Sequence, residues 1–333
     1  MNIVFRVDAT QKIGVGHLMR CISLSEELTK RKNVCYFLSK IDNNYLINKI
    51  NEINIYKKIS HNEEIFKFLN ENDVDWIITD HYDIKSQYIK KIQKNGYNVL
   101  SIDDTSQIHY YSDIVVNQNI GSEKLKFSSE KYTEFLLGTK YVMLRDELLK
   151  RKEKIGKKDV KKILITLGGS DNDNITLKIL RSIENKQIEI LLLIGCFNPF
   201  YNEIKNYAKK NKNIKIIISP KNMADIYLGT DISISAGGST CYELAYFGIP
   251  NIIITLANNQ LNIANELCKK NISFYAGKKD NFNSKKLNYY IEELINNKSL
   301  HSKMKKFGIE LIDGKGKKRI VNLMDKYENR NEK

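Results

Sequence analysis

Short β-rich runs alternate with amphipathic helical patterns along nearly the whole of this 333-residue chain. In the first half, apolar residues recur at helical spacing in stretches such as 63–70 and 85–95, which separate the β-rich runs. This alternation is typical of βαβ units and therefore predicts parallel sheets. The strands expected in this half are 2–7, 33–38, 75–80, 97–102, 113–116 and 134–137.

A lysine-rich break at residues 151–162 divides the alternation into two series. The second series has a strand that begins at Lys162 and ends in a glycine turn, and a helical pattern over 284–329. Between them we expect strands at 188–194, 214–218, 232–235 and 251–255. The break is typical of a surface connection, and the length suits two domains. The sequence thus predicts an α/β protein of two doubly wound, Rossmann-like domains facing a cleft, with boundaries at 1–150, 151–162 (linker) and 163–333.

The net charge of +15 raises the question of a nucleic-acid partner. The lysines are spread among many Asn and Ile residues, and the chain has only 3 prolines, which indicates a general compositional bias. No helix-turn-helix, zinc or RNA-binding motif accompanies the charge, so we expect no nucleic-acid partner. A diffuse positive field would still attract an anionic small substrate.

The cysteine pattern and the lengths of the apolar runs indicate the cellular environment of the protein. The chain has 5 cysteines, none of them in a CxxC pair, which disfavours a structural zinc site and a disulfide framework. No apolar run approaches the length of a membrane span, and the first one contains Arg6 and Asp8, unlike a signal peptide. We therefore expect a cytoplasmic protein that does not insert into membranes. The oligomeric state is not determined by these patterns.

A glycine loop with a histidine follows the first expected strand. Gly14 and Gly16 lie between that strand and a helical pattern that begins at His17. The positive end of the helix would disfavour the imidazolium form, leaving a neutral imidazole able to accept a proton from water. Met19 stands where the dinucleotide fingerprint has its third glycine, so we expect no nicotinamide cofactor. The alternative is a tight turn with an incidental histidine.

Three further motifs end strands of the second series. Gly168, Gly169 and Ser170 form a turn whose backbone amides could face an anion, and 235–244 delivers a second glycine turn onto a helix. Glu243, one turn into that helix, could accept from vicinal ribose hydroxyls, or it is a capping-box glutamate. Amides at 258–260 could read a polar ligand. Each motif alone is also compatible with an ordinary turn. The second turn lacks the Gly-Lys-Ser/Thr of a P-loop, which disfavours an ATPase.

In order along the chain, these motifs resemble the UDP-2,4-diacetamido-2,4,6-trideoxy-β-L-altropyranose hydrolases of pseudaminic acid biosynthesis. The resemblance covers residues 3 to about 270. It is carried by Arg6-Val-Asp8, Ile13-Gly-Val-Gly-His17-Leu-Met-Arg20, Asp80-His-Tyr82, Ile102-Asp-Asp104, Asn117-Gln118, Leu137-Gly-Thr-Lys-Tyr141, Leu144-Arg145, Leu167-Gly-Gly-Ser-Asp171, Ala236-Gly-Gly-Ser-Thr240, Glu243-Leu244 and Ala257-Asn-Asn-Gln260.

This resemblance implies a fold of the glycosyltransferase-B (GT-B) type, no metal and no cofactor. It implies that His17 is the catalytic base and that water removes UDP from the sugar, with inversion at the anomeric carbon. The substrate-binding residues implied are Asp8, Gly14, Gly16, Arg20, Asp80, Tyr82, Asn117, Tyr141, Arg145, Gly169, Ser170, Gly237, Gly238, Ser239, Thr240, Glu243, Asn258, Asn259 and Gln260. Two alternatives stay open, a UDP-sugar glycosyltransferase and a non-catalytic binder of UDP-sugars or nucleic acid.

Overall fold

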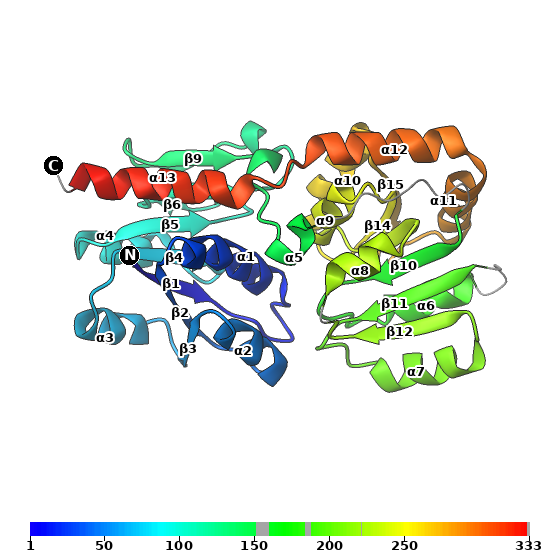
Figure 1. Cartoon of the computed structure of the whole chain (residues 1–333), viewed down its shortest axis with the longest axis horizontal. Helices are drawn as coiled ribbons and strands as arrows, with labels where there is room; N and C mark the ends of the chain where they lie inside the picture. Colours follow the sequence, from blue (N-terminus) through cyan, green and yellow to red (C-terminus); the bar gives the residue numbers. More distant parts are fainter. Residues whose placement is uncertain (151–159, 184–187, 221, 332–333) are drawn as a thin grey trace. The chain divides into compact units, whose positions relative to one another are not determined.

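The structure is a computed structural model that describes residues 1–150, 160–183, 188–220 and 222–331. The chain forms two compact units (Figure 1). The first contains Met1–Asp146 together with Gly314–Lys333, and the second contains Glu147–Asp313. Most of the predicted linker, 151–159, lies outside the described residues.

A seven-stranded parallel sheet forms the centre of the first unit, in the order β3-β2-β1-β4-β5-β7-β9. Its strands are β1 (Asn2–Val7), β2 (Val34–Ser39), β3 (Ile55–Lys58), β4 (Trp76–Asp80), β5 (Asn98–Ile102), β7 (Ile114–Asn117) and β9 (Glu134–Leu137). Two short strands, β6 (His109–Tyr110) and β8 (Ser128–Ser129), pair separately. The helices are α1 (Gly16–Lys30), α2 (Asn44–Asn51), α3 (Glu64–Glu71) and α4 (Ser86–Lys94). The short α5 (Asp146–Leu149) begins at the boundary between the two units.

The six strands expected in this half are confirmed, and β3 is an addition that the sequence did not predict. β3 lies at the edge of the sheet and is largely exposed, so its four residues carry no buried apolar pattern. The strands at the centre of the sheet are apolar and buried on both faces, as a parallel sheet covered by helices requires.

The second unit contains a six-stranded parallel sheet in the order β12-β11-β10-β13-β14-β15. Its strands are β10 (Lys162–Thr166), β11 (Glu189–Ile194), β12 (Ile214–Ile218), β13 (Ile232–Ser235), β14 (Asn251–Thr255) and β15 (Ser273–Lys278). Its helices are α6 (Ile175–Ser182), α7 (Tyr201–Lys210), α8 (Met223–Leu228), α9 (Thr240–Tyr246), α10 (Gln260–Lys269), α11 (Ser284–Asn296) and α12 (Lys298–Leu311). On one face of the sheet, isoleucine and leucine side chains at alternate strand positions pack with residues of α6 and α11 into an apolar core. β15 was not predicted.

The strand order of each sheet reverses direction at one point, and such a point is where open α/β sheets bind ligands. In the first unit the reversal lies between β1 and β4, where Val7 pairs with Asp80. In the second it lies between β10 and β13, where Thr166 pairs with Ser235. The glycine loops of the sequence follow these strands directly.

The last helix, α13 (Gly316–Asn331), corrects the expected domain division, because it belongs to the first unit and not to a C-terminal domain at 163–333. Figure 1 shows it over the first unit, and it contacts α1. Its apolar residues Ile320, Val321 and Met324 are fully buried. The helical pattern predicted over 284–329 is thus three helices of two different units.

Candidate functional site

The loop between β1 and α1 brings a histidine to the carboxyl end of the first sheet. Gly14 has a φ of 82°, a left-handed conformation that favours glycine, and its amide donates to the carbonyl of Thr10 at 2.8 Å. Helix α1 then begins at Gly16, and Val15 at the N-cap supplies no side-chain acceptor. His17 therefore lies in the first turn, beside the end of the neighbouring strand β4.

His17 contacts the carboxylate at the end of β4. Its Nδ1 lies 2.6 Å from Oδ1 of Asp80, whose side chain is fully buried. Nη2 of Arg20 also lies 3.0 Å from Nδ1. The carboxylate contact is the shorter of the two and an ionised carboxylate can only accept, so we assign the proton to Nδ1 and the lone pair of the neutral ring to Nε2. The ring of Tyr82 packs edge-on against the imidazole, with 4.8 Å between centroids. This arrangement fixes the orientation of the ring and makes Nε2 its accepting nitrogen.

Arg20, one turn further along α1, joins two carboxylates. Its Nε donates to Oδ2 of Asp80 at 2.6 Å and its Nη2 donates to Oδ1 at 2.7 Å, a two-point contact. Its Nη1 donates to Oδ1 of Asp104 at 2.8 Å. The Arg20 side chain is 7% exposed, so these charges are paired away from water.

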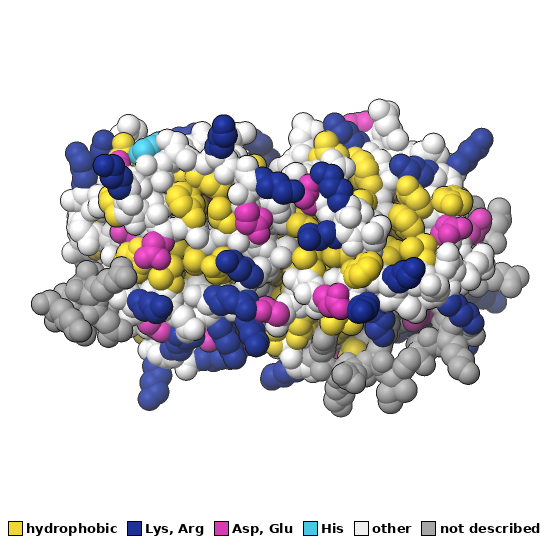
Figure 2. Space-filling view, turned by 90° about the horizontal axis from the view of Figure 1, so that it is seen from above, with side chains coloured by type: hydrophobic (Ala, Val, Ile, Leu, Met, Phe, Trp, Pro, Cys, Tyr) yellow, Lys and Arg dark blue, Asp and Glu magenta, His cyan; other side chains and the backbone are white. Residues whose placement is uncertain are grey.

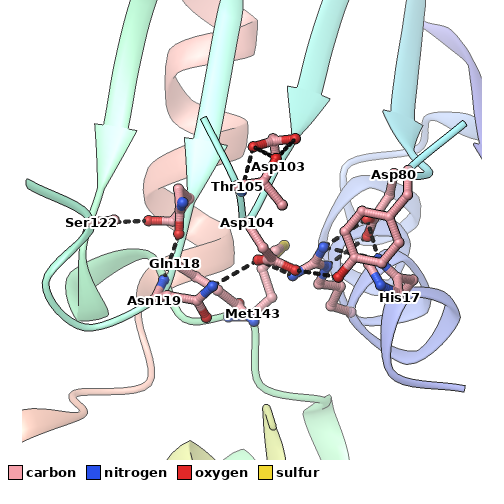
Figure 3. Close-up of polar contacts among 12 residues, drawn as sticks. His17, Asp80, Asp103, Asp104, Thr105, Gln118, Asn119, Ser122 and Met143 are labelled. Atoms are coloured by element: carbon pink, nitrogen blue, oxygen red, sulfur yellow. Dashed lines mark hydrogen bonds and ion pairs between the residues drawn. The ribbon is translucent and has the colours of Figure 1, made fainter. Parts of the chain in front are cut away.

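Figure 3 shows Asp104 between Asn119 on one side and His17 with Asp80 on the other. Asn119 Nδ2 donates to its Oδ1 at 2.8 Å, and the Tyr82 hydroxyl lies 3.5 Å from its Oδ2. Asp103 beside it has a different role, because its Oδ1 accepts from the amides of Thr105 and Ser106 in a local turn. The pair of aspartates after β5 was the sequence signal for Asp104, but the sequence did not tell which one faces the site.

Nearby charges and burial shift the pKa values of these carboxyl groups in opposite directions. Burial raises the pKa of the Asp80 carboxyl, but Arg20 and His17 outweigh burial and hold it below its usual range. The pKa of the Asp104 carboxyl is lowered in the same way, chiefly by Arg20 against the cost of burial. Burial next to the Asp80 charge raises the pKa of the Cys21 thiol. Both carboxylates are therefore ionised at neutral pH, and Cys21 is a buried thiol.

Asp8, predicted with the same site, belongs to a second buried cluster. It forms an ion pair with Arg6, lies 2.9 Å from Nε2 of His81, and accepts from the amide of Lys40 at 2.7 Å. Burial raises its pKa, but the hydrogen bonds from His81 and Arg6 bring it below the usual range. The contacts of Asp8 are thus within the fold at the end of β1.

Other residues predicted in the first unit stabilise the loops that follow β7 and β9. The carbonyl of Asn117 accepts from Ser122 Oγ at 2.9 Å and from the amide of Gly138 at 2.9 Å. Tyr141 ends a short 3₁₀ turn with Lys140 Nζ 5.0 Å from the centre of its ring, and Arg145 is buried just before α5. Asn119, which the sequence left without a role, contacts Asp104 in the cluster around His17.

The glycine turn after β13 in the second unit is built around Gln260. The amides of Gly237 and Leu256 donate to Oε1 of Gln260 at 3.2 and 2.8 Å, so this amide joins two strand ends. A Cβ on Gly237 would meet Gln260 Cβ at 2.9 Å, whereas a Cβ on Gly238 would meet nothing within 4 Å. Beneath the turn, Asn251 donates to Ser235 Oγ at 2.8 Å. Gln260, predicted to bind substrate, thus has a clear structural function.

Helix α9 begins at Thr240, and Glu243 in its first turn contacts a tyrosine of α8. Glu243 Oε2 accepts from the hydroxyl of the buried Tyr227 at 2.5 Å. Ser239 stands at the N-cap of α9, and its side chain makes no capping hydrogen bond. Asn258 and Asn259, at the start of α10, are exposed.

The turn predicted after β10 is present, and Gly168 in it has a φ of 86°, in the left-handed region that favours glycine. Gly169 and Ser170 follow it, and both are half-buried. Asp171 caps α6, accepting from the amides of Ile175 and Thr176 at 2.9 and 2.7 Å. The structure thus brings glycine turns to the ends of both strands at the reversal point of this sheet.

The excess positive charge does not concentrate at one point of the face shown in Figure 2, where acidic side chains lie among scattered lysines and arginines. Within the described ranges, no group of three His, Cys, Asp or Glu side chains has metal-binding geometry. No helix in the described part of the chain has the length and apolar character needed to cross a bilayer.

Comparison with known proteins reveals a match over the second half of the chain. The family model of the Glycosyltransferase family 28 C-terminal domain matches residues 162–324. An uncharacterized protein of Methanocaldococcus jannaschii is 33% identical over 277 residues, which are 78% of this chain and 56% of that protein. The chain therefore spans little more than half the length of this relative. The UDP-2,4-diacetamido-2,4,6-trideoxy-beta-L-altropyranose hydrolase of Campylobacter jejuni is 26% identical, over 81% of this chain and 97% of that enzyme.

Among solved structures, MurG of Acinetobacter baumannii matches 98% of this chain and 99% of its own, with a TM-score of 0.69 and 14% identity. The chain has the GT-B fold. This confirms the predicted fold class of two Rossmann-like α/β domains. At such low identity the structural likeness establishes the fold alone. The match at 162–324 includes the glycine turns after β10 and β13.

Proposed function

We propose that the protein is a nucleotide-sugar hydrolase that removes UDP from UDP-2,4-diacetamido-2,4,6-trideoxy-β-L-altropyranose. The observation that carries the proposal is the contact of 2.6 Å between His17 Nδ1 and Asp80 Oδ1, which leaves Nε2 as the accepting nitrogen. The relative from Campylobacter jejuni, which bears this activity in its name, aligns over most of the chain and supports the choice of substrate. The product is 2,4-diacetamido-2,4,6-trideoxy-L-altrose.

The chemical step needs one base and a good leaving group. His17 Nε2 takes a proton from water while the water oxygen forms a bond to the anomeric carbon. The bond from that carbon to the diphosphate oxygen breaks, and UDP leaves with the electron pair. Attack from the face opposite UDP inverts the anomeric centre. Asp80 keeps the proton on Nδ1 and stabilises the imidazolium that forms, as carboxylates do for catalytic histidines.

In this proposal, residues of the second unit bind the UDP part of the substrate. The turn at 237–240 presents backbone amides and two hydroxyl side chains at the start of α9, a type of segment that suits a diphosphate. Glu243, oriented by Tyr227, would accept from the ribose hydroxyls. These amides would stabilise the charge that develops on the departing phosphate. The chain's own residues supply all of these roles, so the proposal needs no metal and no cofactor.

A UDP-sugar glycosyltransferase is the second candidate, and the match to the Glycosyltransferase family 28 C-terminal domain favours it. A transferase would use the same nucleotide site but would need an acceptor. Incubating the full chain with the UDP-sugar alone separates the two, with free UDP and the anomeric signal followed by NMR. The proposal expects catalytic release of UDP without acceptor, and release only after adding an acceptor would overturn it.

Hydrolysis in ¹⁸O-labelled water tests the bond that breaks. Attack at the anomeric carbon puts the label into the sugar and leaves UDP unlabelled. Label in the β-phosphate of UDP would show attack at phosphorus and would contradict the role given to His17. Failure to release UDP from any UDP-sugar, with or without acceptor, combined with salt-sensitive binding to random DNA, would instead support a non-catalytic binder.

A further inference from the structure

The guanidinium of Arg20 forms its hydrogen bonds with carboxylates of the protein itself, chiefly with Asp80. Its guanidinium gives two parallel hydrogen bonds to Asp80, of 2.6 and 2.7 Å, and a third of 2.8 Å to Asp104. Bidentate contacts of this kind fix the orientation of a carboxylate as well as its position. The same Oδ1 of Asp80 that accepts from Arg20 Nη2 also lies 2.6 Å from His17 Nδ1. Nη2 of Arg20 also lies 3.0 Å from His17 Nδ1, so Asp80 and the guanidinium that orients it together set the proton position on the imidazole.

Asp104 holds the other side of the guanidinium. Its Oδ1 accepts from Arg20 and from Asn119 Nδ2, both at 2.8 Å, so this oxygen is fixed from two elements. Two carboxylates share one guanidinium, which leaves one negative charge beside the neutral imidazole. When His17 takes up a proton in the proposed reaction, the net charge of these four side chains becomes zero. Asp104 follows β5, which lies two positions from β1 in the sheet. It contributes to the cluster a negative charge and a carboxylate oxygen in a fixed position.

We propose that Arg20 is a positioning residue that orients Asp80 against His17, and that Asp104 is the carboxylate that keeps Arg20 in place. The sequence placed Arg20 among the substrate-binding residues; the contacts on two carboxylates and the burial of its side chain favour the positioning role. The catalytic consequence rests on the function proposed above, because it acts through the base His17. The effect on the proton position of His17 is a property of the protein alone.

Arg20→Lys tests the proposal because it keeps the positive charge and removes the two-point contact. Arg31→Lys is the matched control, since Arg31 follows the same helix and contacts Glu27 and Asp325 instead. The full chain is labelled with ¹⁵N-histidine, and the ring nitrogens are observed by two-bond ¹H–¹⁵N NMR. The chain has 5 histidines, and the His17 signals are those that His17→Gln removes.

We expect the neutral His17 ring to carry its proton on Nδ1 in the wild type and in Arg31→Lys. In Arg20→Lys we expect a mixture with the Nε2–H form, which is the form that prevails in free imidazole side chains in water. An unchanged Nδ1–H signal in folded Arg20→Lys would overturn the proposal, whatever activity the enzyme has. If the ring-nitrogen signals of His17 change as expected but the wild-type protein releases no UDP from the substrate, the positioning role is supported and the proposed function is contradicted.

Kinetics then separate positioning from substrate binding. A positioning role predicts a fall in kcat of about tenfold or more in Arg20→Lys, with KM within about twofold of the wild type. A large rise in KM with kcat preserved would assign Arg20 to the substrate and overturn the proposal. Asp104→Asn serves if Arg20→Lys fails to fold, because it keeps the shape of the side chain. We expect it to shift the proton position in the same direction, and wild-type spectra and kcat in that variant would remove Asp104 from the proposal.

Discussion

Nδ1 of His17 and Oδ1 of Asp80 lie 2.6 Å apart although 63 residues separate them in the chain. The contact exists because β4 pairs with β1 in the parallel sheet, with Asp80 opposite Val7. α1 starts a few residues after β1, so its first turn arrives beside the end of β4. A histidine after one strand thereby contacts a carboxylate at the end of the neighbouring strand of the sheet.

The proposed role of His17 as the base is tested by His17→Gln, which keeps a polar side chain of similar reach. We expect kcat for UDP release to fall by about 10²–10⁴-fold, the usual loss when a positioned base is removed. Affinity for UDP should stay unchanged, as measured by calorimetry, because the proposed UDP-binding residues are in the second unit. Turnover near the wild-type value would remove His17 from the chemistry.

Asp80→Asn tests the orienting role separately. An amide in this position can donate to Nδ1, which would place the ring proton on Nε2 and block the accepting nitrogen. We expect a fall in kcat of about 10²–10⁴-fold, as seen when the carboxylate of a catalytic triad becomes an amide. The measurement is steady-state UDP release, with circular dichroism to verify that the variant is folded. Retained activity in this folded variant would contradict the proton assignment.

Acid stability should reflect the lowered pKa values of Asp80 and Asp104. A carboxyl whose folded pKa lies below its unfolded value stabilises the fold above the unfolded pKa, and this stability is lost as pH falls through the folded pKa. We therefore expect the free energy of unfolding, measured with urea, to fall below about pH 4, the ordinary range for aspartate. In Asp104→Asn this acid dependence should be less steep, because one less proton binds on unfolding. Equal slopes for both proteins would contradict it.

Lys317 at the start of α13 is a stability determinant of the first unit. Its side chain is buried, and its Nζ donates to Glu26 Oε2 and Asp146 Oδ1, both at 2.8 Å. Lys317→Met should destabilise the protein by about 1–3 kcal/mol, because the carboxylate of Glu26 loses its partner in a partly buried place. Lys318→Met, at an exposed neighbouring position, is the matched control and should change stability by less than about 0.5 kcal/mol. Equal urea midpoints for the two variants would refute this role.

Gly237 should tolerate no side chain, in contrast to its neighbour. A Cβ there would come within 2.9 Å of Gln260 Cβ and 3.0 Å of its carbonyl oxygen. Gly237→Ala is expected to cost about 1–3 kcal/mol through overpacking. Gly238→Ala has open space around its new methyl group and is the control for stability. Thermal unfolding of the two variants checks the difference, and the prediction fails if Gly238→Ala is the less stable one.

The strands and glycine turns could be predicted from local patterns, since each is written in consecutive residues. Apolar runs marked the buried strands, and the predicted glycine turns are present, with Gly14 and Gly168 in left-handed conformations. The exposed edge strand β3 was missed because nothing in its four residues is buried. Gln260 was expected to face a ligand, yet its Oε1 accepts from two backbone amides of separate strand ends. A local pattern carries no information on such a partner.

The sequence by itself determined that the chain alternates strands and helices, and that a histidine follows the first strand on a glycine loop. Only the tertiary structure decided the partners of that histidine, because the order of strands in a parallel sheet is set by long-range packing. It also returned α13 to the first unit, where three fully buried apolar side chains and the ion pairs of Lys317 stabilise it. The pattern over 284–329 predicts helices in either case. It does not predict which unit they pack against, because burial of an apolar helix face depends on the element that lies opposite.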